Sequence, residues 1–173
     1  MQLEICSHEV IARLLALTHS ESSFIRKFVV MVLVNISVPP DNQVKLHEFG
    51  VLPHVIRLLG DQSVVVARHA VLVITNMCNT ASNQLAVVNL GGLVPVIKLC
   101  EALDLDCARF AGLALANLST HRSNRVPVVR LGGLTRGGEA RVFVGTVQLQ
   151  LQSGEPPSHG GAQRHGGHHE TRR

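Results

Sequence analysis

The stretch SNQLAVVNLGGLVPVIKL, at residues 82–99, has the pattern of a helix, a glycine break and a second helix. A related stretch, DNQVKLHEFGVLPHVIRL, fills residues 41–58, and a shorter one, SNRVPVVRLGGL, fills residues 123–134. The pattern returns every 41 residues, and residues 42–82 align with residues 83–123 without a gap at 13 identical positions. Self-similarity at a fixed period of this length is the signature of a repeat protein.

Each 41-residue unit is predicted to form three helices. In the first complete unit, a short helix near 42–49 begins with an asparagine whose side chain can accept free backbone N–H groups. Gly50 then allows a left-handed turn, and a second helix follows near 51–60. The third helix, near 63–78, is the longest and most apolar, so it is expected to build the core.

The next unit repeats this plan. Its second and third helices are expected near 92–102 and 104–118. The core stripes of the two third helices are predicted to be Ala70, Val73, Ile74 and Met77, and then Ala111, Ala114, Leu115 and Leu118. Asp104 and Asp106 are expected to favour the start of a helix through its dipole.

The period divides the chain into five segments: a partial unit over 1–41, complete units over 42–82 and 83–123, the start of a fourth over 124–135, and a tail over 136–173. The tail is rich in Gly, His and Arg, and its composition predicts disorder. Two explanations stay open for the abrupt change, a natural tail or a sequence that stems from another exon or reading frame. Because repeat units are stable mainly against their neighbours, the ends are expected to expose apolar surface and to favour self-association.

Composition excludes several classes of function. Of the 173 residues, 46% are apolar and 16% charged, and the net charge of +4 is spread along the chain, so no specific nucleic-acid partner is expected. The longest apolar run, residues 28–34, is far shorter than the roughly 20 residues of a membrane-spanning helix. The four cysteines lie far apart and read as reduced core thiols, and the start of the chain lacks the pattern of a signal peptide. A cytoplasmic location is expected, with the nucleus and the cilium as alternatives.

The sequence holds no pattern of catalytic, metal-binding or cofactor-binding residues. Its histidines lack the spacing of a metal site, and the glycines of NLGGLVP and RLGGLTRGG lie between predicted helices without a phosphate-binding signature. We therefore expect a protein that is not an enzyme and that needs neither a cofactor nor a metal.

The repeat resembles a known family. Three helices per unit, a period of 41 residues, and Gly and Asn at fixed positions are similar to the armadillo repeat, with CARFAGLALANLSTHRSN at residues 107–124 as the closest match. The resemblance covers about residues 1–135 and implies an all-α, right-handed superhelix whose third helices line a concave groove. An array of HEAT repeats is the alternative, but it would more often have two helices per unit.

The resemblance also implies a binding site. In armadillo proteins an asparagine near the end of each third helix often faces the groove and holds the backbone of an extended peptide. The matching residues are Asn35, Asn76 and Asn117. A primary amide offers donors and an acceptor together, so it can bind a peptide unit whatever side chain that unit carries. The alternative is that these amides satisfy the ends of their own helices.

Neighbours on the same helical faces extend this candidate site. Four residues before each asparagine lie apolar side chains, and eight residues before it lie basic ones; His69 lies seven residues before Asn76. These residues are Met31, Leu72 and Leu113, and Lys27, Arg68 and Arg109. The basic residues indicate an extended, acidic partner, or else they pair with acids of adjacent loops. Phe28 and Phe110 are interpreted as core residues.

The leading functional prediction is a non-enzymatic protein-interaction scaffold that binds an extended or helical peptide. Peptide-binding nuclear import adaptors carry Trp on the corresponding face, and this chain has no Trp, which argues against that role. Two further alternatives are a structural segment of a cytoskeletal or ciliary assembly and a truncated product without a function of its own.

Overall fold

The computed structural model of the protein describes residues 6–132, so the predictions for the tail and for the end of the fourth unit lie outside it. The described part is all-helical, as expected. Its elements are α2 (His8–Leu17), α3 (Ser23–Ser37), α4 (Pro40–Glu48), α5 (Val51–Leu58), α6 (Val64–Met77), α7 (Ala81–Asn89), α8 (Leu93–Leu99), α9 (Leu105–Thr120), the 3-10 helix η1 (Arg122–Asn124) and α10 (Arg125–Arg130).

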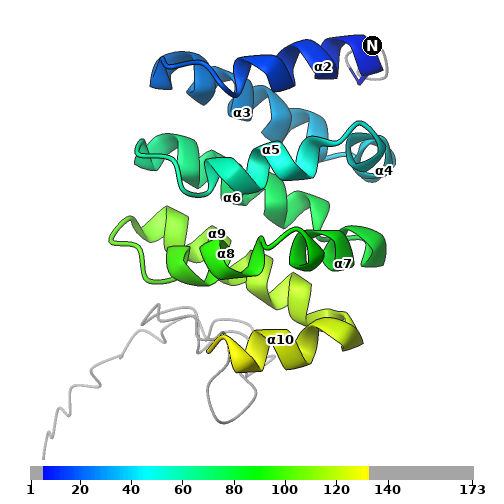
Figure 1. The fold of residues 1–173 in the computed structure, drawn as a ribbon, viewed down its shortest axis with the longest axis vertical. Helices are drawn as coiled ribbons and strands as arrows, with labels where there is room; N and C mark the ends of the chain where they lie inside the picture. The colour runs from blue at the N-terminus through cyan, green and yellow to red at the C-terminus, as the bar shows by residue number, and fades with distance from the viewer. Residues whose placement is uncertain (1–5, 133–173) are drawn as a thin grey trace, which may run out of the picture.

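The helices stack in layers from α2 and α3 at one end to α10 at the other (Figure 1). The three long helices α3, α6 and α9 pack side by side, while α5 covers α6 and α8 covers α9. The groups α4–α6 and α7–α9 each contain the predicted order of a short, a second and a long helix. Among the described residues, α6 therefore packs between two other long helices, and α3 and α9 each pack against α6 alone.

Glycine separates the first helix from the second in each unit. Gly50, Gly91 and Gly132 have positive φ values of 72°, 78° and 76°. This left-handed conformation is unfavourable in free energy for any residue that has a Cβ. Gly92 has a different role, because a Cβ there would lie 2.8 Å from the side chain and 2.9 Å from the carbonyl of Val87. The first glycine turns the chain and the second allows α7 and α8 to approach closely.

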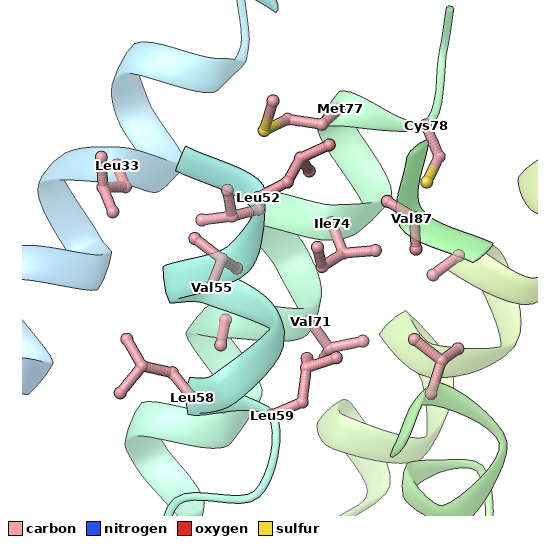
Figure 2. Close-up of a cluster of buried hydrophobic side chains, with 14 of the residues drawn as sticks. Leu33, Leu52, Val55, Leu58, Leu59, Val71, Ile74, Met77, Cys78 and Val87 are labelled. Atoms are coloured by element: carbon pink, nitrogen blue, oxygen red, sulfur yellow. The ribbon is translucent and has the colours of Figure 1, made fainter. Parts of the chain in front are cut away.

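The core lies between the second and third helices of each unit (Figure 2). In the close-up, Leu52 and Val55 of α5 lie between Leu33 of α3 and Ile74 of α6, with Val87 of α7 beyond Ile74. All of the core-stripe residues predicted from the spacing are buried: Ala70, Val73, Ile74, Met77, Ala111, Ala114, Leu115 and Leu118. The four cysteines are free and buried, as expected.

The asparagines at the start of the first helices do not cap them, which corrects the prediction. The N-caps of α4 and α7 are Pro39 and Thr80, so Asn42 and Asn83 lie inside the first turns. Their buried amides instead donate to carbonyls at the end of the preceding long helix, as Asn83 does to Met77 O at 2.9 Å. Pro40 occupies the first turn of α4, where its missing N–H costs nothing.

These buried amides also join neighbouring units. Asn83 Nδ2 lies 3.4 Å from the carbonyl of Gln43, and Asn124 Nδ2 lies 3.0 Å from the carbonyl of Gln84, 41 residues further along. A second link runs through ion pairs at the other end of the long helices. Arg26 makes a two-pronged contact with Asp61 at 2.7 Å and 2.9 Å. Amides and ion pairs together fix each unit on the next.

Candidate functional site

The ten predicted site residues share one surface of the stack. They lie on α3, α6 and α9, and each keeps part of its surface exposed although these helices bury their other sides. We call this surface the asparagine face. It is defined by Asn35, Asn76, Asn117, Met31, Leu72, Leu113, Lys27, Arg68, Arg109 and His69.

Two of its asparagines are held by the neighbouring long helix. Asn117 Nδ2 donates to the carbonyl of Thr75 at 3.3 Å, and Asn76 Nδ2 lies 3.5 Å from the carbonyl of Val34, in the same register. Asn76 also donates to Ser37 Oγ at 3.0 Å. Asn35 is exposed, and its side chain makes no hydrogen bond to any residue that the structure describes.

These bonds use donors of the amides and leave the acceptors open. Within residues 6–132, the Oδ1 atoms of Asn76 and Asn117 accept no hydrogen bond, and neither is a buried atom. An amide fixed through its N–H groups holds its oxygen in one direction. Less side-chain entropy is therefore lost when a ligand binds. Such an oxygen can accept a hydrogen bond from the backbone N–H of a bound peptide.

An apolar strip runs beside the asparagines. Met31 and Leu72 are partly buried, and Leu113 is exposed. They occupy equivalent positions on the three long helices and lie one helical turn before the asparagines. A ligand lying along the amides would therefore meet apolar side chains on one side of its backbone.

The basic residues of the face differ in how far acids neutralise them. Arg68 makes a bidentate ion pair with Asp104, the N-cap of α9. The hydrogen bond from this guanidinium lowers the pKa of Asp104. Arg109 pairs with Asp106 at 3.0 Å on the exposed surface of α9. Lys27 has no acidic partner in the described part of the chain, and its Nζ lies 5.5 Å from the centre of the Phe28 ring. Part of the predicted basic series thus serves to join units.

Aromatic side chains add to the face, and one of them corrects the sequence-based interpretation. Phe28 is exposed rather than in the core, and it packs edge to face on Phe24 with ring centres 4.7 Å apart. Phe110 is partly buried against the core, and Arg109 stacks over it at 4.8 Å. Sequence reasoning missed Phe24, because this position is not aromatic in the other two units.

His69 is held by its own helix, and two of the cysteines are buried as neutral thiols. His69 Nδ1 lies 2.6 Å from the carbonyl of Val65, one turn back on the same helix. Burial raises the pKa of Cys78 to about 12 and that of Cys100 to about 11, so both are neutral thiols at physiological pH. Among residues 6–132, no three His, Cys, Asp or Glu side chains are grouped as metal ligands.

A family model described as armadillo-like matches residues 7–129. The chain belongs to the armadillo-like family. The match spans both complete units, most of the partial unit over 1–41 and the first half of the segment over 124–135, and it agrees with the resemblance expected from the repeat. None of the curated proteins compared with this armadillo chain matches it.

Solved structures of designed armadillo repeat proteins share the fold. One of them, in complex with the peptide (KR)4, has a TM-score of 0.72 at 23% identity; the likeness covers 76% of this chain and 56% of that one. Another, computationally designed for modular peptide recognition, has a TM-score of 0.69 at 25% identity over 72% of this chain and 54% of that one. This armadillo chain thus spans little more than half the length of either structure. None of the helices in the described residues is long and apolar enough to cross a membrane.

Proposed function

We propose that this armadillo protein is a non-enzymatic interaction scaffold that binds an extended peptide along its asparagine face. The observation that carries the proposal is the repeated amide geometry. Asn76 and Asn117 are each anchored through Nδ2 to the preceding long helix, and the Oδ1 of each accepts no hydrogen bond from residues 6–132. The armadillo fold commonly binds peptides, and two designed relatives are described as peptide binders.

The spacing of the amides fits an extended backbone. Packed helices lie about 8–10 Å apart, and an extended strand advances about 3.3 Å per residue. One asparagine per long helix would therefore engage roughly every third peptide unit. The apolar strip of Met31, Leu72 and Leu113 has the same spacing and would contact side chains of the same strand.

The charge of the face favours an acidic peptide over a basic one. Lys27 offers a cation without an acidic partner among the described residues, and Arg109 is exposed on α9. The chain has no Trp to hold the stems of Lys or Arg side chains, although one designed relative was solved with (KR)4. Asp104 and Asp106 offset Arg68 and Arg109, so the acidic preference rests chiefly on Lys27.

Peptide binding can be measured by fluorescence anisotropy with the full chain and labelled extended peptides of acidic, neutral and basic composition. We expect the acidic peptides to bind most tightly. The double variant Asn76→Ala with Asn117→Ala should weaken their binding at least tenfold, whereas Asn89→Ala, an exposed asparagine on α7, should leave it unchanged. Equal binding by the double variant would refute the proposed site, and preferential binding of basic peptides would refute the acidic preference.

A protein with this role is proposed to act in the cytoplasm, the nucleus or the cilium. The alternative of a structural segment predicts a different result in the same experiment. Loss of both amides would then reduce stability through the lost bonds to Thr75 and Val34, without changing the affinity of any peptide.

A further inference from the structure

A group of exposed aromatic side chains lies on α3, within the asparagine face. Phe24 and Phe28 are 67% and 46% exposed, and their rings pack edge to face with centres 4.7 Å apart. Met31 and Asn35 follow on the same side of this helix. We call Phe24, Phe28 and Met31 the aromatic cluster. Two exposed aromatic rings in contact, unlike a single one, form an apolar patch of the kind that marks a binding surface.

The side of α3 that carries Phe24 is open because of the architecture and not because α3 lies at one end of the stack. The equivalent residues on α6 and α9 are Val65 and Asp106, 41 and 82 positions further along. Both helices have another long helix packed before them, yet Val65 is partly exposed and Asp106 is exposed. The two equivalents of Phe28 are also partly exposed. This side of the long helices therefore stays accessible inside the stack.

Lys27 supplies a positive charge beside the aromatic cluster. Its equivalent Arg68 pairs with Asp104, which lies 36 residues further along, at the start of the next long helix. The residue 36 positions after Lys27 is Ser63, which carries no carboxylate. The nearby Asp61 already makes an ion pair with an arginine of α3. Among the described residues, Lys27 therefore lacks the acidic partner that its equivalent has, and the reason is the change from Asp to Ser.

Together these groups suit a ligand that has both an aromatic ring and a carboxylate. A ligand ring can pack edge to face on Phe24 in the way that Phe28 does, and such pairs are more favourable than the buried area alone. The ammonium group of Lys27 lies 5.5 Å from the centre of the Phe28 ring. A carboxylate that pairs with Lys27 would therefore bind next to the ring that rests on Phe24.

The spacing of these groups predicts the spacing in the ligand. Phe24 and Lys27 are three residues apart on one helix, so their Cβ atoms are about 5–6 Å apart. In an extended strand, side chains two positions apart point the same way and are separated by about 6.6 Å. An acidic residue two positions from an aromatic residue therefore matches this part of α3.

We propose that the aromatic cluster and Lys27 bind an aromatic and an acidic side chain, two positions apart, of the extended peptide that lies on the asparagine face. The inference rests on the proposed function, because the same peptide continues along Asn76 and Asn117. The amides hold the peptide backbone whatever its sequence, whereas the aromatic cluster and Lys27 select the sequence.

The other two long helices do not offer the same combination. On α6, the equivalents of the two phenylalanines are Val65 and His69. On α9, an acidic residue, Asp106, stands at the position of Phe24. Because the aromatic pair occurs on one long helix of the three, it fixes the register in which a peptide lies along the amides.

Fluorescence anisotropy of the full chain with a labelled extended peptide that contains Glu-Ser-Phe-Ser-Glu tests the proposal. An acidic residue on each side of the phenylalanine allows for either direction of the strand. One matched peptide has serine in place of the phenylalanine, and another has glutamine in place of both glutamates. We expect the dissociation constant to rise at least tenfold for the serine peptide and at least threefold for the glutamine peptide.

Variants of the chain identify the residues that make this selection. Phe24→Ala should remove most of the preference for phenylalanine over serine, and Lys27→Met should remove the preference for glutamate over glutamine. The controls are Leu103→Ala and Lys98→Met, which change exposed residues outside the asparagine face and should alter neither preference. Circular dichroism melting shows whether each variant is folded.

The outcomes separate this inference from the proposed function. The double variant Asn76→Ala with Asn117→Ala should weaken the phenylalanine and serine peptides by the same factor and keep the preference between them. Equal binding of the two peptides by the wild type, or a full preference retained by Phe24→Ala, would overturn the inference and leave the role of the amides intact. Unchanged affinity in the double variant, with the preference lost only in Phe24→Ala, would refute the amide site and support the aromatic cluster.

Discussion

The side-chain amide of Asn117 donates to the backbone carbonyl of Thr75, on the neighbouring long helix, at 3.3 Å. Forty-one residues earlier, Asn76 stands in the same relation to Val34. The two alternatives that the sequence leaves open, binding and structural support, are therefore compatible within one side chain. The Nδ2 side of each amide joins two units, and among the described residues the Oδ1 side accepts no hydrogen bond.

The buried amide of Asn83 is expected to be one of the most important polar groups for stability. It donates to Met77 O at 2.9 Å and to Gln43 O at 3.4 Å, and Asn83 is fully buried. Asn83→Ala removes the buried donor that both carbonyls share, so the free energy of unfolding should fall by about 2–3 kcal/mol. Urea unfolding followed by circular dichroism measures this, with Asn89→Ala as the control. A loss no larger than that of the control would contradict the role given to these amides.

The glycines between the first and second helices should respond differently to alanine. Gly91→Ala imposes a positive φ on a residue with a Cβ and should cost about 1 kcal/mol of unfolding free energy. Gly92→Ala should cost more, because the new Cβ meets Val87 at 2.8 Å in a packed region. Gly60→Ala is the control, since its Cβ would make only an ordinary contact of 3.8 Å and its φ is not positive. Thermal melting of the three variants should rank Gly92 as most sensitive and Gly60 as least.

Asp104 has two structural roles that can be separated. It caps α9 by accepting from Cys107 N at 2.8 Å, and it pairs with Arg68. Asp104→Asn keeps the cap and loses the ion pair, so it should cost about 0.5 kcal/mol, since partly exposed pairs contribute little. Asp104→Ala loses both and should cost about 1 kcal/mol more. Asp106→Asn, which disrupts only the exposed pair with Arg109, should be close to neutral.

The same ion pair predicts a dependence on pH. The hydrogen bonds from Arg68 and from Cys107 N hold the pKa of Asp104 below its usual value. Its stabilising effect is therefore complete at neutral pH and is lost as the pH falls through the lowered pKa of the folded state. Urea unfolding at pH 7 and at pH 3 should show that the free energy of unfolding falls more for the wild type than for Asp104→Asn. Equal losses would mean that the pair does not contribute.

A pair of histidines gives a second dependence on pH, nearer to neutrality. His54 Nδ1 lies 3.2 Å from both His19 Nε2 and Thr18 Oγ1, where α5 meets the end of α2. Burial, and then the charges of His19 and Arg57, lower the pKa of His54. His54 therefore binds a proton more readily in the unfolded chain than in the folded one. The stability that neutral His54 contributes is complete above about pH 6.5 and falls as the pH drops toward the lowered pKa.

The change in melting temperature between pH 7.5 and pH 5.5 tests this histidine pair. The melting temperature of the wild type should fall more than that of His54→Asn. The asparagine amide lies near the position of Nδ1 and keeps a polar contact with Thr18, but it does not titrate in this range. His8→Asn, an exposed histidine outside the pair, should behave like the wild type. A His54→Asn variant with the full acid sensitivity would place its origin elsewhere.

Much of the fold was predictable from the sequence because the repeat fixes it in a redundant way. The glycines at 41-residue spacing and the apolar stripe of α6 each indicate the same helices, and the observed ends of α6 differ by one residue from the prediction. The asparagines at positions 42 and 83 were misread as caps because a cap and an amide inside the first turn look alike in sequence. The difference depends on the tertiary partners of each amide, the carbonyls of another helix.

The period predicts the equivalent positions of Asn76 and Asn117 on neighbouring long helices, but it does not predict the ion pairs around them. The period alone places Asn76 and Asn117 on one surface. It does not reveal that Arg68 is neutralised by Asp104, which lies in the next unit and does not repeat. The exposure of Phe28 was also missed, because an aromatic residue on a helix is more often buried and only the packing around α3 leaves it open.

The most direct test of peptide binding on the asparagine face is a nuclear magnetic resonance titration of the labelled chain with the tightest-binding acidic peptide. The account predicts that the side-chain NH₂ signals of Asn76 and Asn117 shift with saturation, because their Oδ1 atoms accept new hydrogen bonds. The buried amides of Asn83 and Asn124 should not shift. Saturable binding that leaves the side-chain signals of Asn76 and Asn117 unchanged would contradict it.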